Sequence, residues 1–229
     1  MIFKNKKHLF FDLDHTLWDF DKNSEVAFDI ILKKYDFGFS LQDFLEHYIP
    51  KNQYYWSLYQ INQISQEDLR FRRLNDVFEI LNTPIAKQLV NQISEEYIEL
   101  LPNSNHLFEG TIEILEYLKP KYHLHIVTNG FHYVQDKKMK NANIFHYFST
   151  ITNSELAGVK KPHPTIFEYA LSLAKATKQD SVMIGDSIEA DIKGALDFGI
   201  DAIFFNEKNI KINKNIPQIN RLVELKKLL

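Results

Sequence analysis

The chain has 229 residues, 45% of them hydrophobic and 25% charged, which are the proportions of a globular protein large enough for a core domain plus a smaller one. Its formal net charge of −3 gives no electrostatic reason to expect a nucleic-acid polymer or a membrane as partner. The absence of cysteine excludes disulfides, thiolate nucleophiles and cysteine-based zinc sites. No apolar stretch approaches the roughly 18 residues of a membrane helix or forms a signal-peptide core, so we expect a cytoplasmic protein.

The first predicted element is a buried strand over residues 7–11, a continuous apolar and aromatic run typical of a parallel sheet. It stops at Asp12 and Asp14, and Thr16 follows. Burying a carboxylate is costly unless it is paired, hydrogen-bonded or bound to a metal. We therefore interpret the two acids as a reaction centre on a bound Mg²⁺, in which Asp12 attacks phosphorus and Asp14 moves the proton. A helix N-cap cluster around Thr16 is the alternative.

The segment after residues 18–21 contains no convincing strand until about residue 102. Helices are predicted from Ser24 to about Tyr35 and from Ser40 to about His47, and then over residues 51–61, 65–81 and 83–100. Ser65 and Asp68 form a capping-box pattern, and Thr83 followed by Pro84 is typical of a helix start. Because this all-helical block follows the first strand directly, we expect it to be inserted as a cap.

From Pro102 onward, predicted strands alternate with predicted helices. The strands are 123–127, 148–152, 181–184 and 201–205, and the helices are 111–118, 137–142, 164–177, 190–198 and a final helix to the C-terminus. This alternation indicates right-handed crossovers and a parallel sheet. The predicted fold is α/β, with a doubly wound, Rossmann-like core of residues 1–17 and 103–229 and an inserted helical cap of residues 18–102.

Polar groups follow the predicted strands, where ligands of such sheets bind. The hydroxyl, amide and backbone of Thr128–Gly130 suit phosphate oxygens, although a plain Asn-Gly turn is the alternative. Lys160 and Lys161 precede two prolines that stiffen the loop, so that a lysine can be aimed at phosphoryl oxygens. A solvated basic turn would explain the same residues.

A further acidic group follows the strand 181–184. Mg²⁺ takes one or two carboxylates together with waters and substrate phosphate, and Asp186 and Asp12 can supply these carboxylates. Asp191, one helical turn later, would hold a metal-bound water or Lys161. The alternative is that Asp186 or Ser187 only caps the helix that follows.

These groups together resemble the motifs of a known family. The order Asp12-x-Asp14-x-Thr16, then Thr128, then Lys161-Pro, then Gly185-Asp186-x-x-x-x-Asp191 resembles the four motifs of the haloacid dehalogenase-like superfamily, over essentially the whole chain. Within the superfamily, residues 18–20, 128–131 and 158–162 are most similar to the pyrimidine 5′-nucleotidase group, which dephosphorylates canonical and noncanonical nucleoside monophosphates.

The resemblance implies a role for each acid. Asp12 would form an aspartyl-phosphate, and Asp14 would protonate the leaving alkoxide and then activate water. Asp12, Asp186 and the backbone carbonyl of Asp14 would bind Mg²⁺. Asp191 would help to position these ligands without binding the ion itself. Haloacid dehalogenases lack the second aspartate, so Asp14 argues for phosphoryl transfer.

It also implies the residues that hold the substrate. Thr16, Thr128 and Asn129 would bind the phosphoryl group, and Lys161 would neutralise its charge. Lys160 competes for this role, but Lys161 matches the family position just before proline. His15 and Trp18 stay unassigned, as do the aromatic residues of 54–59. We interpret His123 and His125 as neighbours on one strand face rather than as a metal pair.

The predicted function is a Mg²⁺-dependent phosphatase acting on a small phosphorylated metabolite, with a 5′-nucleotidase for nucleoside monophosphates as the leading assignment. A sugar-phosphate or phosphoglycolate phosphatase or mutase of the same superfamily is the alternative, because the core motifs do not choose the leaving group. A binding module that kept the fold and lost turnover is the non-enzymatic alternative. The protein is expected to be a monomer or homodimer.

Overall fold

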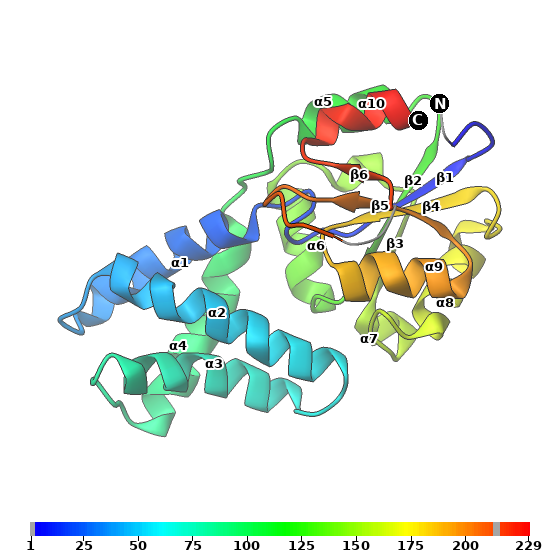
Figure 1. The fold of residues 1–229 in the computed structure, drawn as a ribbon. Helices are drawn as coiled ribbons and strands as arrows, with labels where there is room; N and C mark the ends of the chain where they lie inside the picture. The colour runs from blue at the N-terminus through cyan, green and yellow to red at the C-terminus, as the bar shows by residue number, and fades with distance from the viewer. Residues whose placement is uncertain (1–2, 213–215) are drawn as a thin grey trace. The chain divides into compact units, whose positions relative to one another are not determined.

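The computed structural model of the chain describes residues 3–212 and 216–229, so residues 1–2 and 213–215 of the predicted core lie outside the described residues. The chain divides into two compact units, one of Met1–Asp19 with His106–Leu229 and one of Phe20–Asn105 (Figure 1). We call them the sheet unit and the helical unit. Among the described residues, no helix has the length and apolar character needed to cross a membrane.

The sheet unit is built on six parallel strands in the order β3-β2-β1-β4-β5-β6. Their bounds are β1 His8–Phe11, β2 His123–Thr128, β3 Thr150–Asn153, β4 Ser181–Gly185, β5 Asp201–Phe205 and β6 Gln218–Ile219. Phe11 lies opposite Ile126 on β2 and Ile184 on β4, so these three strands end at one edge. The predicted doubly wound parallel sheet is confirmed, and only the two-residue β6 was not foreseen.

Helices cover both faces of this sheet, with α8 and α9 on one side and α5 and α10 on the other (Figure 1). The helices are α5 Thr111–Leu118, α6 His132–Asn141, α7 Ser154–Ala157, α8 Pro164–Ala174, α9 Gly194–Phe198 and α10 Leu225–Leu228. A π-helical turn, Ile188–Lys193, leads into α9, and short 3₁₀ turns lie at Phe145–Tyr147 and Leu222–Glu224. Phe10, Val127 and Met183 of the strands pack with Ile166 and Phe167 of α8 in one buried cluster.

The helical unit consists of four helices, α1 Phe20–Tyr35, α2 Leu41–Gln60, α3 Gln66–Ile80 and α4 Lys87–Leu100, followed by a 3₁₀ turn at Leu101–Asn103. Its core is aromatic: the Phe28 ring stacks on Tyr97 with ring centres 4.4 Å apart and meets Phe44 and Tyr48 at 4.7 Å and 4.5 Å. These rings join α1, α2 and α4, so the unit has a hydrophobic core of its own.

Two predictions about helix boundaries in this unit were wrong. The predicted helices that end at His47 and begin at Lys51 are the single helix α2, which continues through Pro50. Burial of Phe44, Tyr48 and Tyr55 on either side of Pro50 offsets the hydrogen bond that proline removes. The predicted start at Thr83–Pro84 is wrong as well, because α4 begins at Lys87 after Ala86.

Other boundaries differ by a few residues. Helix α1 begins at Phe20 rather than Ser24, α6 at His132 rather than Lys137, and β3 at Thr150 rather than Phe148. Helix α8 ends at Ala174 rather than Thr177, and the helix predicted to start at Ala190 begins at Ile188. The predicted final helix is limited to α10. In contrast, the capping box of α3 is confirmed, with Ser65 Oγ accepting from Asp68 N at 3.0 Å.

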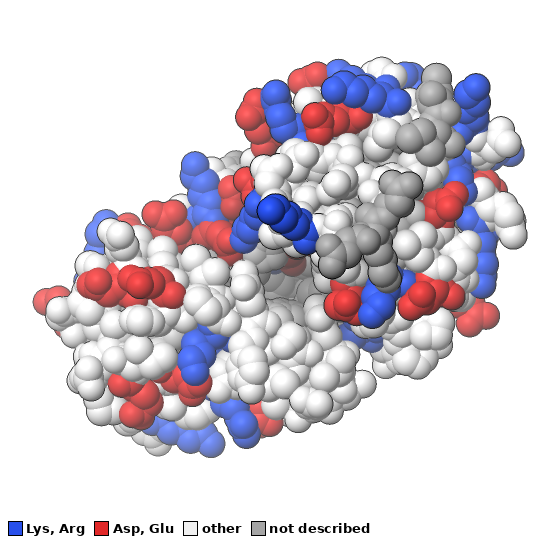
Figure 2. Space-filling view, in the orientation of Figure 1, with Lys and Arg blue, Asp and Glu red and all other residues white. Residues whose placement is uncertain are grey.

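Acidic and basic side chains are interspersed over the face shown in Figure 2. This mixture agrees with the small net charge of −3. A strongly basic stripe, which would attract a nucleic-acid backbone, is not seen on the described residues of that face.

Candidate active site

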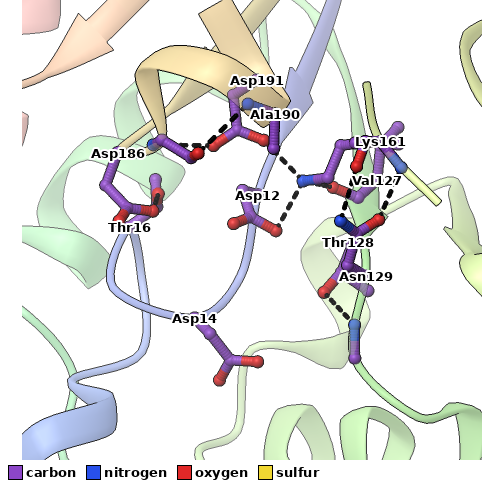
Figure 3. A network of polar contacts seen from close by, with 12 residues as sticks. Asp12, Asp14, Thr16, Val127, Thr128, Asn129, Lys161, Asp186, Ala190 and Asp191 are labelled. Atoms are coloured by element: carbon purple, nitrogen blue, oxygen red, sulfur yellow. Dashed lines mark hydrogen bonds and ion pairs between the residues drawn. The ribbon is translucent and has the colours of Figure 1, made fainter. Parts of the chain in front are cut away.

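The site lies at the carboxyl ends of the three central strands (Figure 3). Asp12 N donates to Ile184 O at 2.9 Å, which extends the pairing of β1 with β4 up to Asp12. Thr128 ends β2, and Asp186 follows β4. The structure therefore brings together the three strand ends that the sequence singled out, because their strands are neighbours in register.

Lys161 lies in the loop between α7 and α8, and its side chain reaches this edge of the sheet. That side chain is only 1% exposed. Its Nζ lies 2.9 Å from Asp12 Oδ1 and 2.7 Å from Asp191 Oδ1, and it donates to Val127 O at 2.6 Å. Three oxygens on different segments thus fix the ammonium beside Asp12. The structure places Lys161, rather than Lys160, in this position.

Asn129 holds the backbone of Lys161. Its Oδ1 accepts from Lys161 N at 2.7 Å, and its Nδ2 donates to Lys161 O at 2.9 Å. The adjoining Lys161–Pro162 peptide bond is cis. Both polar atoms of the Asn129 side chain are therefore engaged with Lys161, rather than turned toward a ligand.

Two further carboxylates, Asp186 and Asp191, lie near Asp12. Asp12, Asp186 and Asp191 each offer an oxygen, and these oxygens lie within 4.8 Å of one another. Thr16 Oγ1 donates to Asp186 Oδ1 at 3.1 Å, which turns the Thr16 hydroxyl toward that acid. The cluster has three carboxylates but one ammonium, which pairs with Asp12 and Asp191, so it has an excess of acidic groups and the oxygen donors that a hard divalent cation prefers. The cluster is chemically suited to hold such a metal ion.

The pKa values of the acids reflect their burial together with only one ammonium. Burial raises the pKa of Asp12 to about 7, because it outweighs the attraction of Lys161, and Asp191 adds to the rise. Burial, followed by repulsion from Asp191 and Asp12, raises the pKa of Asp186 well above its usual range. Burial alone would lower the pKa of Lys161, but Asp12 and Asp191 raise it to about 12. A bound cation would oppose the rises at both acids.

The path of the chain after β4 brings Asp191 into this cluster. Ser187 N donates to Asp191 Oδ2 at 3.0 Å, and Ser187 Oγ accepts from Ala190 N at 3.1 Å. The π-helical turn Ile188–Lys193 carries Asp191 back toward Lys161, an irregularity common at functional sites. Ser187 therefore does cap this turn, which was the alternative reading of the segment, and the capping coexists with the acidic cluster.

Asp14 lies apart from the Asp186–Asp191 group (Figure 3). Its Oδ1 is 2.6 Å from Lys138 Nζ, and its Oδ2 accepts from Gln135 Nε2 at 2.8 Å. Gln135 Nε2 also donates to Thr128 Oγ1 at 2.8 Å. Sequence reasoning missed both residues: Gln135 lay outside the helix predicted to start at Lys137, and Lys138 lay within it but was assigned no role. Their i, i+3 spacing just after the Thr128 turn was the signal that could have identified them.

The remaining candidates lie elsewhere. His123 and His125 belong to β2 and lie at or near its amino end, with His123 opposite His8 on β1, away from the strand ends that carry the site. The aromatic residues of 54–59 belong to α2 of the helical unit. Trp18 is buried in the sheet unit, with Lys138 Nζ 4.3 Å from the centre of its ring.

Comparisons with known proteins identify a family and several related chains. The model of a family described as haloacid dehalogenase-like hydrolase matches residues 9–205. The pyrimidine 5′-nucleotidase PynA of Streptococcus pneumoniae is 29% identical over 207 residues, which cover 90% of this chain and 86% of PynA. The pyrimidine 5′-nucleotidase YjjG of Escherichia coli is 29% identical over 225 residues, 96% of each chain. The crystal structure of the Bacillus subtilis HAD-hydrolase YfnB, bound to magnesium, is similar with a TM-score of 0.89 and 25% identity, covering 98% of this chain and 99% of that one.

Proposed function

Because the chain belongs to the haloacid dehalogenase-like hydrolase family, we propose that it is a Mg²⁺-dependent phosphatase that forms an aspartyl-phosphate on Asp12 and acts on nucleoside monophosphates. One observation carries the proposal. Asp12 combines an ammonium at 2.9 Å with two further carboxylates whose oxygens lie within 4.8 Å. This arrangement provides a nucleophile, a charge for the phosphoryl group and ligands for a divalent cation at one point.

The proposed reaction has two steps. In the first, Asp12 Oδ attacks phosphorus, the bond from phosphorus to the leaving oxygen breaks, and Asp14 gives that oxygen a proton. In the second, Asp14 takes a proton from water as the water oxygen attacks the aspartyl-phosphate. The bond from phosphorus to Asp12 breaks, inorganic phosphate leaves, and both acids return to their starting states.

The surrounding groups stabilise the charge that develops on the phosphoryl oxygens. Lys161 supplies a fixed ammonium beside Asp12, in a buried setting where such a charge acts strongly. Thr128 Oγ1 accepts N–H groups from Gln135 and Gly130, so its own proton is available for a phosphoryl oxygen. Asn129 contributes by fixing Lys161, and Thr16 by orienting Asp186.

The donor set also suits Mg²⁺. Asp12, Asp186 and the backbone carbonyl of Asp14 would hold the ion, with Asp191 close behind. When bound, Mg²⁺ would add positive charge at the phosphoryl oxygens. Support for this ion comes from the excess of carboxylates in the cluster and from the magnesium-bound relative YfnB.

The nucleotide part of the proposal is supported by similarity to the two pyrimidine 5′-nucleotidases over most of each chain. We propose that the helical unit, Phe20–Asn105, is the cap that chooses the leaving group. Its separate aromatic core allows its surface residues to vary while the chemistry of the sheet unit is kept.

The nucleophile is tested by the substitution Asp12→Asn. We expect phosphate release from nucleoside monophosphates to fall by roughly 10⁴-fold or more, because an amide does not form the phosphoenzyme. Circular dichroism should show a folded protein. Asp197→Asn, which removes an exposed acid on α9, is the matched control and should keep wild-type activity. Substantial turnover by the Asp12→Asn variant would contradict the covalent mechanism.

The same assay, run on wild type with nucleoside monophosphates, sugar phosphates and phosphoglycolate, tests the substrate class. We expect the highest kcat/KM with a nucleoside monophosphate. Activity confined to sugar phosphates or phosphoglycolate would agree with the phosphatase assignment but refute the nucleotidase assignment.

Metal dependence is a separate prediction. Treatment with EDTA should abolish phosphate release, and Mg²⁺ should restore it, because three carboxylates around one ammonium need a further cation. Asp186→Asn should raise the Mg²⁺ concentration for half-maximal activity by on the order of 100-fold. Activity that resists EDTA after dialysis would rule out the metal requirement.

A further inference from the structure

The carboxylate of Asp14 is held at both of its oxygens by one helix. Lys138 Nζ lies 2.6 Å from Oδ1, and Gln135 Nε2 lies 2.8 Å from Oδ2. Gln135 and Lys138 are three residues apart on α6, so they lie on the same helix face one turn apart. A carboxylate restrained at both oxygens has lost most of its freedom to rotate.

Lys138 differs from an ordinary surface lysine. Its side chain is 3% exposed and that of Asp14 is 19% exposed, and Nζ lies 4.3 Å from the centre of the Trp18 ring. A buried ammonium is tolerated when it is paired and its position is fixed. The cation–π contact with the indole ring helps to fix the ammonium, and the ammonium in turn fixes Asp14.

Gln135 connects Asp14 to the phosphoryl-binding strand end. Its single Nε2 donates both to Asp14 Oδ2 and to Thr128 Oγ1, each at 2.8 Å. This close approach requires a glycine at position 130, since a Cβ atom there would lie 2.3 Å from Gln135 Nε2. The bridge sets the separation between the acid and the hydroxyl that faces the substrate phosphate.

We propose that Lys138 and Gln135 are positioning residues, which hold the carboxyl group of Asp14, protonated by the water of the preceding cycle, at the place where it gives its proton to the leaving oxygen. The inference rests on the proposed phosphatase function and extends it to two residues outside the family motifs. Neither residue touches the reacting atoms in this role, and each acts through Asp14. Their loss should therefore matter most when the leaving group needs a proton.

The dependence on the leaving group supplies the test. A nucleoside leaves as an alkoxide and requires protonation, whereas p-nitrophenolate is stable without it. The ratio kcat/KM reports the steps up to departure of the leaving group. We expect Lys138→Met to lower kcat/KM by about 10- to 100-fold with a nucleoside monophosphate, and by no more than about threefold with p-nitrophenyl phosphate. Lys138→Arg, which keeps the charge, should recover part of the loss.

Two further variants provide a control and a second test. Lys140→Met removes an equal charge from the same helix at a side chain that is 58% exposed and pairs with Asp136, so both substrates should keep wild-type values. Gln135→Met removes the bridge without leaving a buried ammonium unpaired. Loss of the Thr128 contact should lower kcat/KM equally with both substrates, and loss of the Asp14 contact should lower it further only with the nucleoside monophosphate. This variant tests the inference if thermal unfolding shows that Lys138→Met is not folded.

Each remaining outcome has a defined meaning. Equal losses on both substrates would assign Lys138 a general structural role and overturn the inference. Faster turnover of the nucleoside monophosphate by Lys138→Met would overturn it as well, because the lysine would then hold Asp14 in an unproductive place. Wild-type protein that releases phosphate from neither substrate would refute the proposed function, and the inference with it.

Discussion

Gly185 ends β4 directly beside the acid that braces Lys161. A Cβ atom at this position would lie 2.2 Å from Asp191 Oδ2 and 2.5 Å from its carboxyl carbon. Asp191 is fully buried, and its two oxygens are held by Lys161 Nζ and Ser187 N. The absence of a side chain at Gly185 is what allows Asp191 to contact Lys161.

We predict that Gly185→Ala displaces Asp191 and thereby weakens its 2.7 Å ion pair with Lys161. Activity should fall by about 10- to 100-fold, and the free energy of unfolding by about 1–3 kcal/mol, the usual range for an overpacked site. Phosphate release, measured at a temperature where urea titration shows both proteins folded, separates the two effects. A fully active Gly185→Ala enzyme would show that Asp191 is not needed in its observed place.

The elements differ in how well the sequence predicted them. Strands β1 and β5 and the capping box of α3 were found because their signals are local: an apolar run, or a serine three residues before an acid. The joined helix α2 was not, since packing across the helical unit overrides the local effect of Pro50. Gln135 and Lys138 were missed for a similar reason, because their importance comes from contact with Asp14, which is distant in sequence.

A histidine pair joins β1 and β2 near their amino ends. His125 is 1% exposed, with Nε2 3.0 Å from His8 Nδ1 and Nδ1 2.8 Å from Thr150 Oγ1. Burial, followed by repulsion from His8 and His123, lowers the pKa of His125 to about 3. The ordinary value, about 6.5, applies to the unfolded chain. Because of this lowered pKa, the free energy of unfolding depends on pH.

Between those two pKa values the unfolded state binds a proton at His125 that the folded state does not bind. The contribution to stability is therefore complete above about pH 6.5 and is lost as the pH falls toward about 3. We predict that His125→Phe, which keeps a ring against Phe10, removes roughly 3 kcal/mol of the loss in unfolding free energy between pH 7 and pH 4.5. Urea titrations at the two pH values measure it, and parallel losses in both proteins would contradict the assignment.

At the scale of the whole molecule, the sequence predicted which residues meet at one edge of the sheet. Asp12 and Asp186 were predicted to lie together because parallel strands bring their carboxyl ends to one edge, whatever the intervening segments do. Lys161, which lies in a loop, was added to them by its position just before proline, which resembles a family motif. The choice of leaving group, which we propose lies with the helical unit, was not predicted from the sequence. Helical periodicity indicates which residues of that unit form a core, but it carries no information about a ligand.

The strand order also has a consequence for how the protein is made. β1 lies at the centre of the sheet but is synthesised first, and its neighbours β2 and β4 begin only at His123 and Ser181. The helical unit, Phe20–Asn105, is one continuous segment that is synthesised before either neighbour. It can complete its local helix contacts early, as low contact order favours. Lys138 and Lys161, which pair with Asp14 and Asp12, are also synthesised well after these acids, so the ion pairs of the site can form only late.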